Sequence, residues 1–155
     1  MIEVTTYQEI EDFLKHQLVG RIGCHADGIT YIVPVSYAYD GEYVYCHGKE
    51  GMKMYMMRKN PNLCFEVDNY QSLDNWKSVI AWGVFEELKG GPEKAICIER
   101  LRNRILPMIT SQTMRFSEDW PFSESNEVPG SFFRIKLVEK TGRQEKAEVK
   151  VYFGG

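Results

Sequence analysis

The sequence lacks several features by which common protein classes are recognised. No apolar run reaches the roughly 18 residues that a transmembrane helix needs. The first residues also show no basic region followed by an apolar stretch, as a secretory signal would. Lys and Arg number 19 against 22 Asp and Glu, a net charge of -3, whereas nucleic-acid-binding surfaces concentrate positive charge. We therefore expect a cytoplasmic protein that binds neither membranes nor nucleic acid.

Metal, disulfide and nucleotide motifs are missing as well. The four cysteines, Cys24, Cys46, Cys64 and Cys97, lie far apart in apolar stretches. Zinc sites need clustered ligands, and disulfide frameworks belong to short secreted chains. We therefore interpret the cysteines as buried free thiols and expect no metal site. No G-x-G-x-x-G, G-x-x-x-x-G-K-[ST], H-E-x-x-H or G-x-S-x-G motif occurs, which argues against the enzyme classes that these motifs mark.

The chain is instead rich in aromatic residues and in alternating apolar segments. It has 3 Trp, 9 Tyr and 8 Phe among 155 residues, and we expect a single domain over 1–155. The periodicity predicts strands at 18–26, 29–39, 42–47, 62–69, 76–88, 131–138 and, near the end, 149–153. It predicts helices after the capping residue Thr6, at 52–59 and at 92–106, with an irregular stretch at 107–130. These elements favour an α+β, mainly β class: an antiparallel barrel of about six strands with two or three flanking helices.

Two Asp-Gly dipeptides, at 27–28 and 40–41, predict the register of the first three strands. This dipeptide is typical of two-residue hairpin turns. Counting outward from both turns places Arg21 opposite Pro34, and Pro34 opposite His47. Because directly paired side chains share a face of the sheet, these three residues form one row, with Ser36 and Tyr45 one step along. The opposite face carries the residues expected in the core: Ile22, Val33, Val35, Tyr37, Val44 and Cys46.

The stretch from His47 to Lys53 is the best candidate for a binding site. A loop with two glycines, Gly48 and Gly51, leads into a helix, and a helix N-terminus favours an anion. Lys53 in the first turn opposes the helix dipole and would suit a bound phosphate, or it is a solvated lysine on a plain turn. Arg21 is a second cation for the same anion, or a surface arginine. His47 is a ligand or a proton donor, or a structural histidine.

Several segments occur together in a fixed order and spacing between residues 15 and 90. They are 18–23 (LVGRIG), 32–37 (IVPVSY), 43–48 (YVYCHG) with 50–53 (EGMK), 60–61 (NP), 64–67 (CFEV) and 76–83 (WKSVIAWG). In these segments the chain resembles the flavin-binding split-barrel superfamily of pyridoxamine 5′-phosphate oxidase-like proteins, and within it the branch that includes nitroimidazole-resistance proteins. The resemblance implies an antiparallel split β-barrel that holds FMN, or FAD, at a homodimer interface.

The resemblance also implies which residues hold the flavin. They are Val33, Pro34, Val35 and Ser36, whose backbone runs along the flavin, then His47, Gly48, Met52 and Lys53 at the phosphate, and Lys77, Ser78 and Trp82 with Gly83, across the dimer. Arg21 joins this set from the predicted row. The chain ends in VKVYFGG rather than in the substrate motif with arginine and proline of true pyridoxamine phosphate oxidases. Synthesis of pyridoxal phosphate is therefore not expected.

Three functions stay open on the sequence. The leading hypothesis is an FMN-dependent oxidoreductase that passes electrons to a small organic acceptor, nitroaromatic or quinone-like, with His47 supplying a proton or orienting the ring. The second is a flavin-binding or flavin-carrying protein without turnover, because no other acid or base is evident. The third is a β-barrel interaction module without flavin, in which Arg21 and Lys53 never meet a phosphate.

Overall fold

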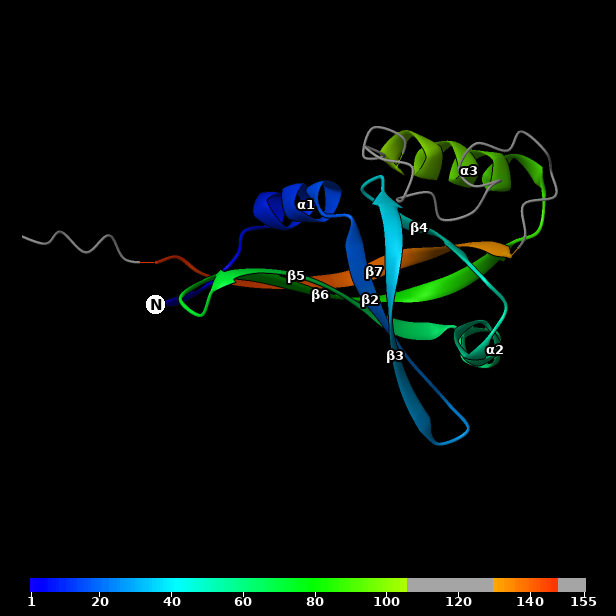
Figure 1. The fold of residues 1–155 in the computed structure, drawn as a ribbon, viewed down its shortest axis with the longest axis horizontal. Coiled ribbons are helices and arrows are strands. Elements are labelled where there is room, and N and C mark those ends of the chain that lie inside the picture. The colour runs from blue at the N-terminus through cyan, green and yellow to red at the C-terminus, as the bar shows by residue number, and fades with distance from the viewer. Residues whose placement is uncertain (106–129, 148–155) are drawn as a thin grey trace, which may run out of the picture.

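The structure is a computed structural model that describes residues 1–105 and 130–147 (Figure 1). Its elements are β1 (Ile2–Val4), α1 (Tyr7–His16), β2 (Val19–Ala26), β3 (Ile29–Tyr39), β4 (Tyr43–Gly48), α2 (Met52–Lys59), β5 (Asn62–Ser72), β6 (Asn75–Leu88), α3 (Gly91–Ile105) and β7 (Ser131–Glu145). None of the helices in these ranges is long and apolar enough to cross a membrane. The strand expected at 149–153, and nearly all of the irregular stretch expected at 107–130, lie outside the described residues.

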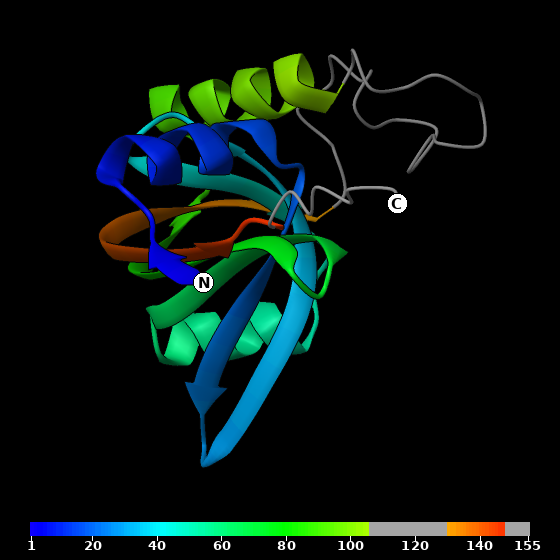
Figure 2. The same ribbon diagram turned by 90° about the vertical axis from the view of Figure 1, so that its left-hand side faces the viewer.

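The strands form one antiparallel sheet that closes on itself as a split barrel, as expected. Their order is β1-β7-β4-β3-β2-β5-β6, and β6 pairs with β7 to complete the ring. α1 and α3 lie on one side of the ring and α2 lies on the other, while the β2–β3 hairpin projects beyond it (Figures 1 and 2). β7 was expected to end at residue 138 but continues to Glu145, because β6 and β1 pair with it over this charged stretch. The short strand β1 was not expected at all.

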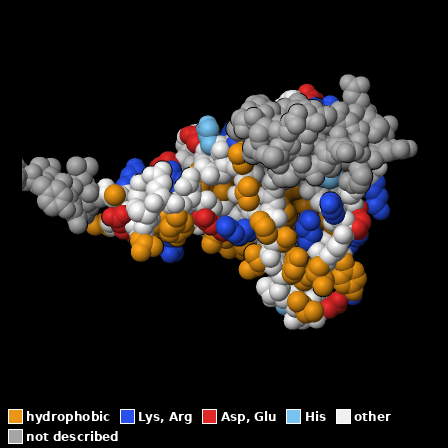
Figure 3. All heavy atoms as spheres, viewed as in Figure 1, with side chains coloured by type: hydrophobic (Ala, Val, Ile, Leu, Met, Phe, Trp, Pro, Cys, Tyr) orange, Lys and Arg blue, Asp and Glu red, His pale blue; other side chains and the backbone are white. Residues whose placement is uncertain are grey.

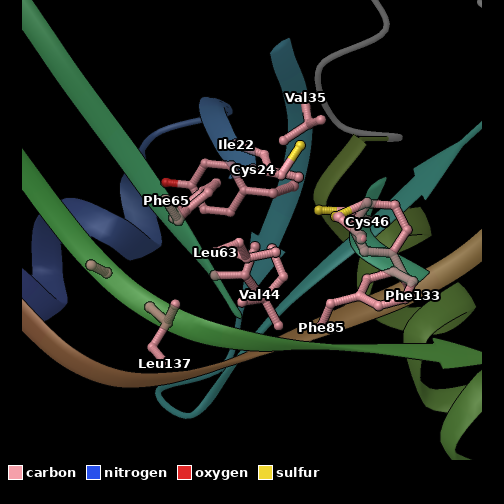
Figure 4. Close-up of a cluster of buried hydrophobic side chains, with 14 of the residues drawn as sticks. Ile22, Cys24, Val35, Val44, Cys46, Leu63, Phe65, Phe85, Phe133 and Leu137 are labelled. Atoms are coloured by element: carbon pink, nitrogen blue, oxygen red, sulfur yellow. The ribbon is translucent and has the colours of Figure 1, made fainter. Parts of the chain in front are cut away.

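The barrel interior holds the face that the sequence assigned to the core. Ile22, Val35, Tyr37, Val44 and Cys46 are buried, and Val33 packs against them while partly exposed. Aromatic side chains from the other strands complete this core, as the close-up shows (Figure 4): Phe65, Phe85 and Phe133. All four cysteines are free, as expected, and all are buried except Cys64, which is partly buried.

The helix α1 is fastened to the barrel by polar contacts as well as by apolar packing. Thr6 caps it as predicted, since its Oγ1 accepts from the Glu9 backbone N–H at 3.3 Å. The buried carboxylate of Glu11 accepts from the Tyr39 hydroxyl at 2.9 Å and forms an ion pair with Lys140. The Lys140 ammonium also donates to the Tyr39 hydroxyl at 2.8 Å. One buried ionic network therefore joins α1, β3 and β7.

The predicted register is confirmed in the first hairpin and wrong in the second. Arg21 pairs with Pro34, as expected, and Asp27 and Gly28 both have positive φ, as this two-residue turn requires. In the second hairpin Tyr39 pairs with Val44, two residues away from the expected register, so His47 does not lie opposite Pro34.

The cause of this shift is the side chain of Asp40. Its Oδ1 accepts from the backbone N–H groups of Glu42 and Tyr43 at 2.9 and 2.7 Å, and its Oδ2 accepts from the Tyr45 hydroxyl at 2.7 Å. Asp40 therefore stands at the first position of the turn instead of at its centre. Because the shift is by two residues, every side chain keeps its expected face.

Candidate functional site

The split in the barrel lies beside the first part of β3. β3 pairs with β2 from Ile29 to Ser36, but its pairing with β4 covers only Tyr37–Tyr39. Over 33–36 the edge of β3 that faces β4 therefore has no strand partner among the described residues. Backbone N–H and C=O groups on this edge are left for another partner. Pro34 has no N–H to donate and suits such an edge.

The side chains of 33–36 divide between the two faces of β3. Val33 and Val35 point into the core, whereas Pro34 and Ser36 are exposed on the outer face. Contacts from the two valines to a ligand outside the barrel would thus come from their backbone.

Arg21 lies on the same outer face and already has two acidic partners. Its Nη1 is 2.9 Å from Asp68 Oδ2 and 3.4 Å from Glu66 Oε2, both on β5. Burial, followed by the neighbouring Asp68, raises the pKa of Glu66 to about 7. The positive charge of Arg21 is therefore offset mainly by Asp68, its nearer acidic partner. The role of Arg21 as a phosphate ligand stays a prediction.

At the junction of β4 and α2, the side chain of Lys53 folds back against Gly48. A Cβ built on Gly48 would lie 2.7 Å from Lys53 Cε and 2.9 Å from its Nζ, so the end of the Lys53 side chain fills the space beside Gly48 that a larger residue would occupy. α2 begins at Met52, and its N-cap residue Gly51 offers no side-chain hydrogen bond. Free N–H groups of a first helical turn and an adjacent ammonium favour an anion such as a phosphate.

His47 is packed against the start of β7. Its ring centroid is 4.6 Å from that of Phe132, and the two planes are tilted by 44°. A Cβ built on Gly130 would lie 2.6 Å from the Gly48 carbonyl oxygen and 3.0 Å from His47 Nε2. Gly130 also has φ +99, a conformation that favours glycine. The sequence did not indicate that β7 supports the site here, because nothing local links residue 130 to residue 48.

The segment 48–60 runs from the end of β4 to the tip of the projecting hairpin. At its far end Lys59 Nζ donates to both carboxylate oxygens of Asp27 at 3.0 Å, and Asn60 Nδ2 donates to the His25 carbonyl at 2.8 Å. α2 therefore packs against β2. The split thus opens between the β3 edge and the end of β4, and this segment continues from β4 (Figure 1).

The predicted site residues of β6 do not share one face. Ser78 pairs with Asp68, and Trp82 pairs with Cys64 on the outer face, where the indole is exposed. The Lys77 ammonium lies 5.6 Å from the centroid of the Phe13 ring on α1. It lines a pocket of about 300 Å³ that is formed by α1, the β5–β6 hairpin and the end of β7. Lys77 and Ser78 thus serve different surfaces of this chain.

One known protein family matches nearly the whole chain. The family model described as pyridoxamine 5′-phosphate oxidase matches residues 6–144. This chain belongs to the pyridoxamine 5′-phosphate oxidase family. The match extends well beyond residues 15–90, where the sequence motifs lie, and takes in β7 as well.

Individual proteins similar to this chain share about a third of its residues or fewer. An uncharacterized protein of Rhizobium meliloti is 32% identical over 87 residues, which are 56% of this chain and only 58% of that protein. A FAD-binding protein from Mesorhizobium loti is 27% identical, with 94% of this chain and 99% of that one covered and a TM-score of 0.75. A protein proposed to confer 5-nitroimidazole antibiotic resistance in Bacteroides thetaiotaomicron is 19% identical, with 93% and 87% covered and a TM-score of 0.71. This last likeness is one of fold alone.

Proposed function

We propose that this chain binds a flavin nucleotide, FMN or FAD, and acts as an oxidoreductase toward a small organic electron acceptor of the nitroaromatic or quinone type. The observation that carries the proposal is the unpaired β3 edge at 33–36, which flanks the same split as the uncapped start of α2 with Lys53. Membership of the family and the 27% identity to a FAD-binding protein support it. A bound flavin supplies the electron-transfer chemistry, and the chain positions it.

The residues of the split fit the two chemically distinct ends of a flavin mononucleotide. Lys53 and the backbone around Gly48 and Met52 would hold the phosphate. The backbone edge of 33–36 would meet the polar groups of the ring, with Ser36 as a side-chain partner. His47, held by Phe132 and Gly130, would hold a proton beside the ring or fix its orientation.

The outer face of the barrel supports a homodimer as the functional unit. Apolar side chains are exposed there on β2, β3 and β6, where they alternate with core residues: Val19, Ile32, Ile80, Trp82 and Val84. Apolar side chains also gather over the projecting hairpin and α2 (Figure 3). Exposed apolar surface of this kind marks interaction sites. A second copy of the chain would cover this face and bring its own Ser78 and Trp82 toward the flavin.

Replacing Lys53 with alanine should weaken FMN binding, because the ammonium beside Gly48 would no longer face the phosphate. We expect the Kd for FMN to rise about tenfold or more, the effect of losing one charge-assisted hydrogen bond. The control is Lys59→Ala, which removes a lysine from the last turn of the same helix, where it contacts Asp27. Its Kd should stay close to that of the wild type. Fluorescence titration of FMN measures both, and equal affinities would refute the phosphate role of Lys53.

Turnover separates an oxidoreductase from a flavin carrier. The flavin-loaded protein is reduced without oxygen and mixed with nitroaromatic or quinone acceptors, and its reoxidation is followed by absorbance. Reoxidation faster than that of free reduced FMN at the same acceptor concentration supports the proposed activity. Reoxidation no faster than free FMN would leave the carrier as the function.

A further inference from the structure

The loop that leads into α2 is held by a side chain outside it. Gly48 and Gly51 make this loop intrinsically flexible, and the N-cap of α2 gives no side-chain hydrogen bond. Between the glycines lies Glu50, whose carboxylate accepts three hydrogen bonds. Arg58 donates two of them, from Nη1 at 2.8 Å and from Nη2 at 2.6 Å, and Ser131 Oγ donates the third at 2.7 Å.

Arg58 ties the loop to the barrel as well as to its own helix. It lies in the last turn of α2, and its Nε and Nη2 donate to the two carboxylate oxygens of Glu87 on β6 at 2.9 and 2.7 Å. Ser131 is the first residue of β7. The planar guanidinium can meet two carboxylates at once because its five N–H groups form a rigid fork. Arg58 therefore joins the loop and α2 to β6, and Glu50 joins the loop to β7 through Ser131.

This arrangement also affects the negative charge of Glu50 near the proposed phosphate site. Glu50 precedes Lys53 by three residues and lies in the loop that would surround a phosphate. The hydrogen bonds from Arg58, followed by that from Ser131, lower the pKa of Glu50 to about 2, so the carboxylate is charged at neutral pH. An unbalanced carboxylate there would repel a phosphate. The Arg58 guanidinium, which Glu50 shares with Glu87, offsets part of this charge.

We propose that Arg58 is a positioning residue for phosphate binding, which acts through Glu50 by fixing the 48–51 loop and offsetting part of its negative charge. The proposal rests on the proposed function, since the phosphate is that of the flavin. Arg58 lies on the far turn of α2 and is assigned no contact with the flavin itself. Its effect should consequently appear only with ligands that carry a phosphate.

The test compares FMN with riboflavin, which has the same ring without the phosphate. In Arg58→Ala we expect FMN to bind about ten- to a hundredfold more weakly, as for the loss of hydrogen bonds between charged groups, while the riboflavin Kd is unchanged. Glu50→Gln in the Arg58→Ala background should recover part of the loss, because it removes the unbalanced charge. The matched control is Glu87→Gln, which weakens the other contact of Arg58 and should leave the ratio of the two Kd values as in the wild type.

Arg58→Lys keeps the positive charge but cannot donate to two carboxylates as the guanidinium does. It serves as a second variant if Arg58→Ala does not fold. It should lose part of the preference for FMN over riboflavin. If FMN and riboflavin bind equally more weakly to these variants, or if the preference for FMN is unchanged, the role of Arg58 is overturned but the flavin proposal is not. A wild-type protein with no preference for FMN over riboflavin would overturn the phosphate assignment on which it rests.

Discussion

Glu11→Ala is expected to lower the free energy of unfolding by about 3–5 kcal/mol, the usual effect of removing one partner of a buried ion pair. The side chains of Glu11 and Lys140 are only 7% and 14% exposed. Without the carboxylate, the ammonium of Lys140 keeps only the Tyr39 hydroxyl as a described hydrogen-bond partner. Urea unfolding followed by circular dichroism measures the loss.

An exposed pair of the same two residue types provides the control. Lys136 and Glu42 form an ion pair of 3.8 Å whose side chains are 57% and 59% exposed. Glu42→Ala should change the free energy of unfolding by at most about 1 kcal/mol, since exposed pairs contribute little. Similar losses in Glu11→Ala and Glu42→Ala would show that burial of the network does not matter.

Gly83→Ala should destabilise the protein by about 2 kcal/mol or more, because overpacking a filled site forces backbone shifts. Gly83 lies where the register between β6 and β7 shifts and the barrel closes. A Cβ there would be 2.6 Å from the Lys136 carbonyl oxygen and 2.7 Å from Ile135 Cγ2.

The control for Gly83 is the strand glycine Gly23, where an added Cβ would come no closer than 3.8 Å, to Cys64 Cβ. Gly23→Ala should be neutral or stabilising by up to about 1 kcal/mol, through the reduced entropy of the unfolded chain. Midpoints of urea unfolding compare the two variants. A Gly83→Ala protein as stable as Gly23→Ala would disprove the close contact.

The parts of the fold that local chemistry determines were predictable from the sequence. The turn at 27–28 has an Asp and a Gly that both take positive φ, so the β2–β3 register followed from counting. The same dipeptide at 40–41 gave the wrong β3–β4 register, because the Asp40 carboxylate accepts hydrogen bonds from the backbone N–H groups of Glu42 and Tyr43. Which of the two roles an aspartate takes depends on its neighbours in the folded hairpin, among them Tyr45.

In the candidate site, too, contacts between residues close in sequence were predictable and contacts between distant residues were not. The Gly48–Lys53 contact joins residues five apart and was foreseeable from a glycine loop that enters a helix. The acidic partners of Arg21 on β5 and the link from Arg58 to Glu87 join residues 29 to 47 positions apart. Such contacts depend on which strands become neighbours, and periodicity alone does not determine that.

Whether this chain holds a flavin nucleotide can be read from its absorption spectrum. The purified protein is mixed with excess FMN, unbound FMN is removed by gel filtration, and the visible absorption spectrum of the protein fraction is recorded. We expect flavin absorption bands that elute with the protein and that are weaker in Lys53→Ala than in Lys59→Ala. A colourless protein fraction would show that the chain does not bind FMN.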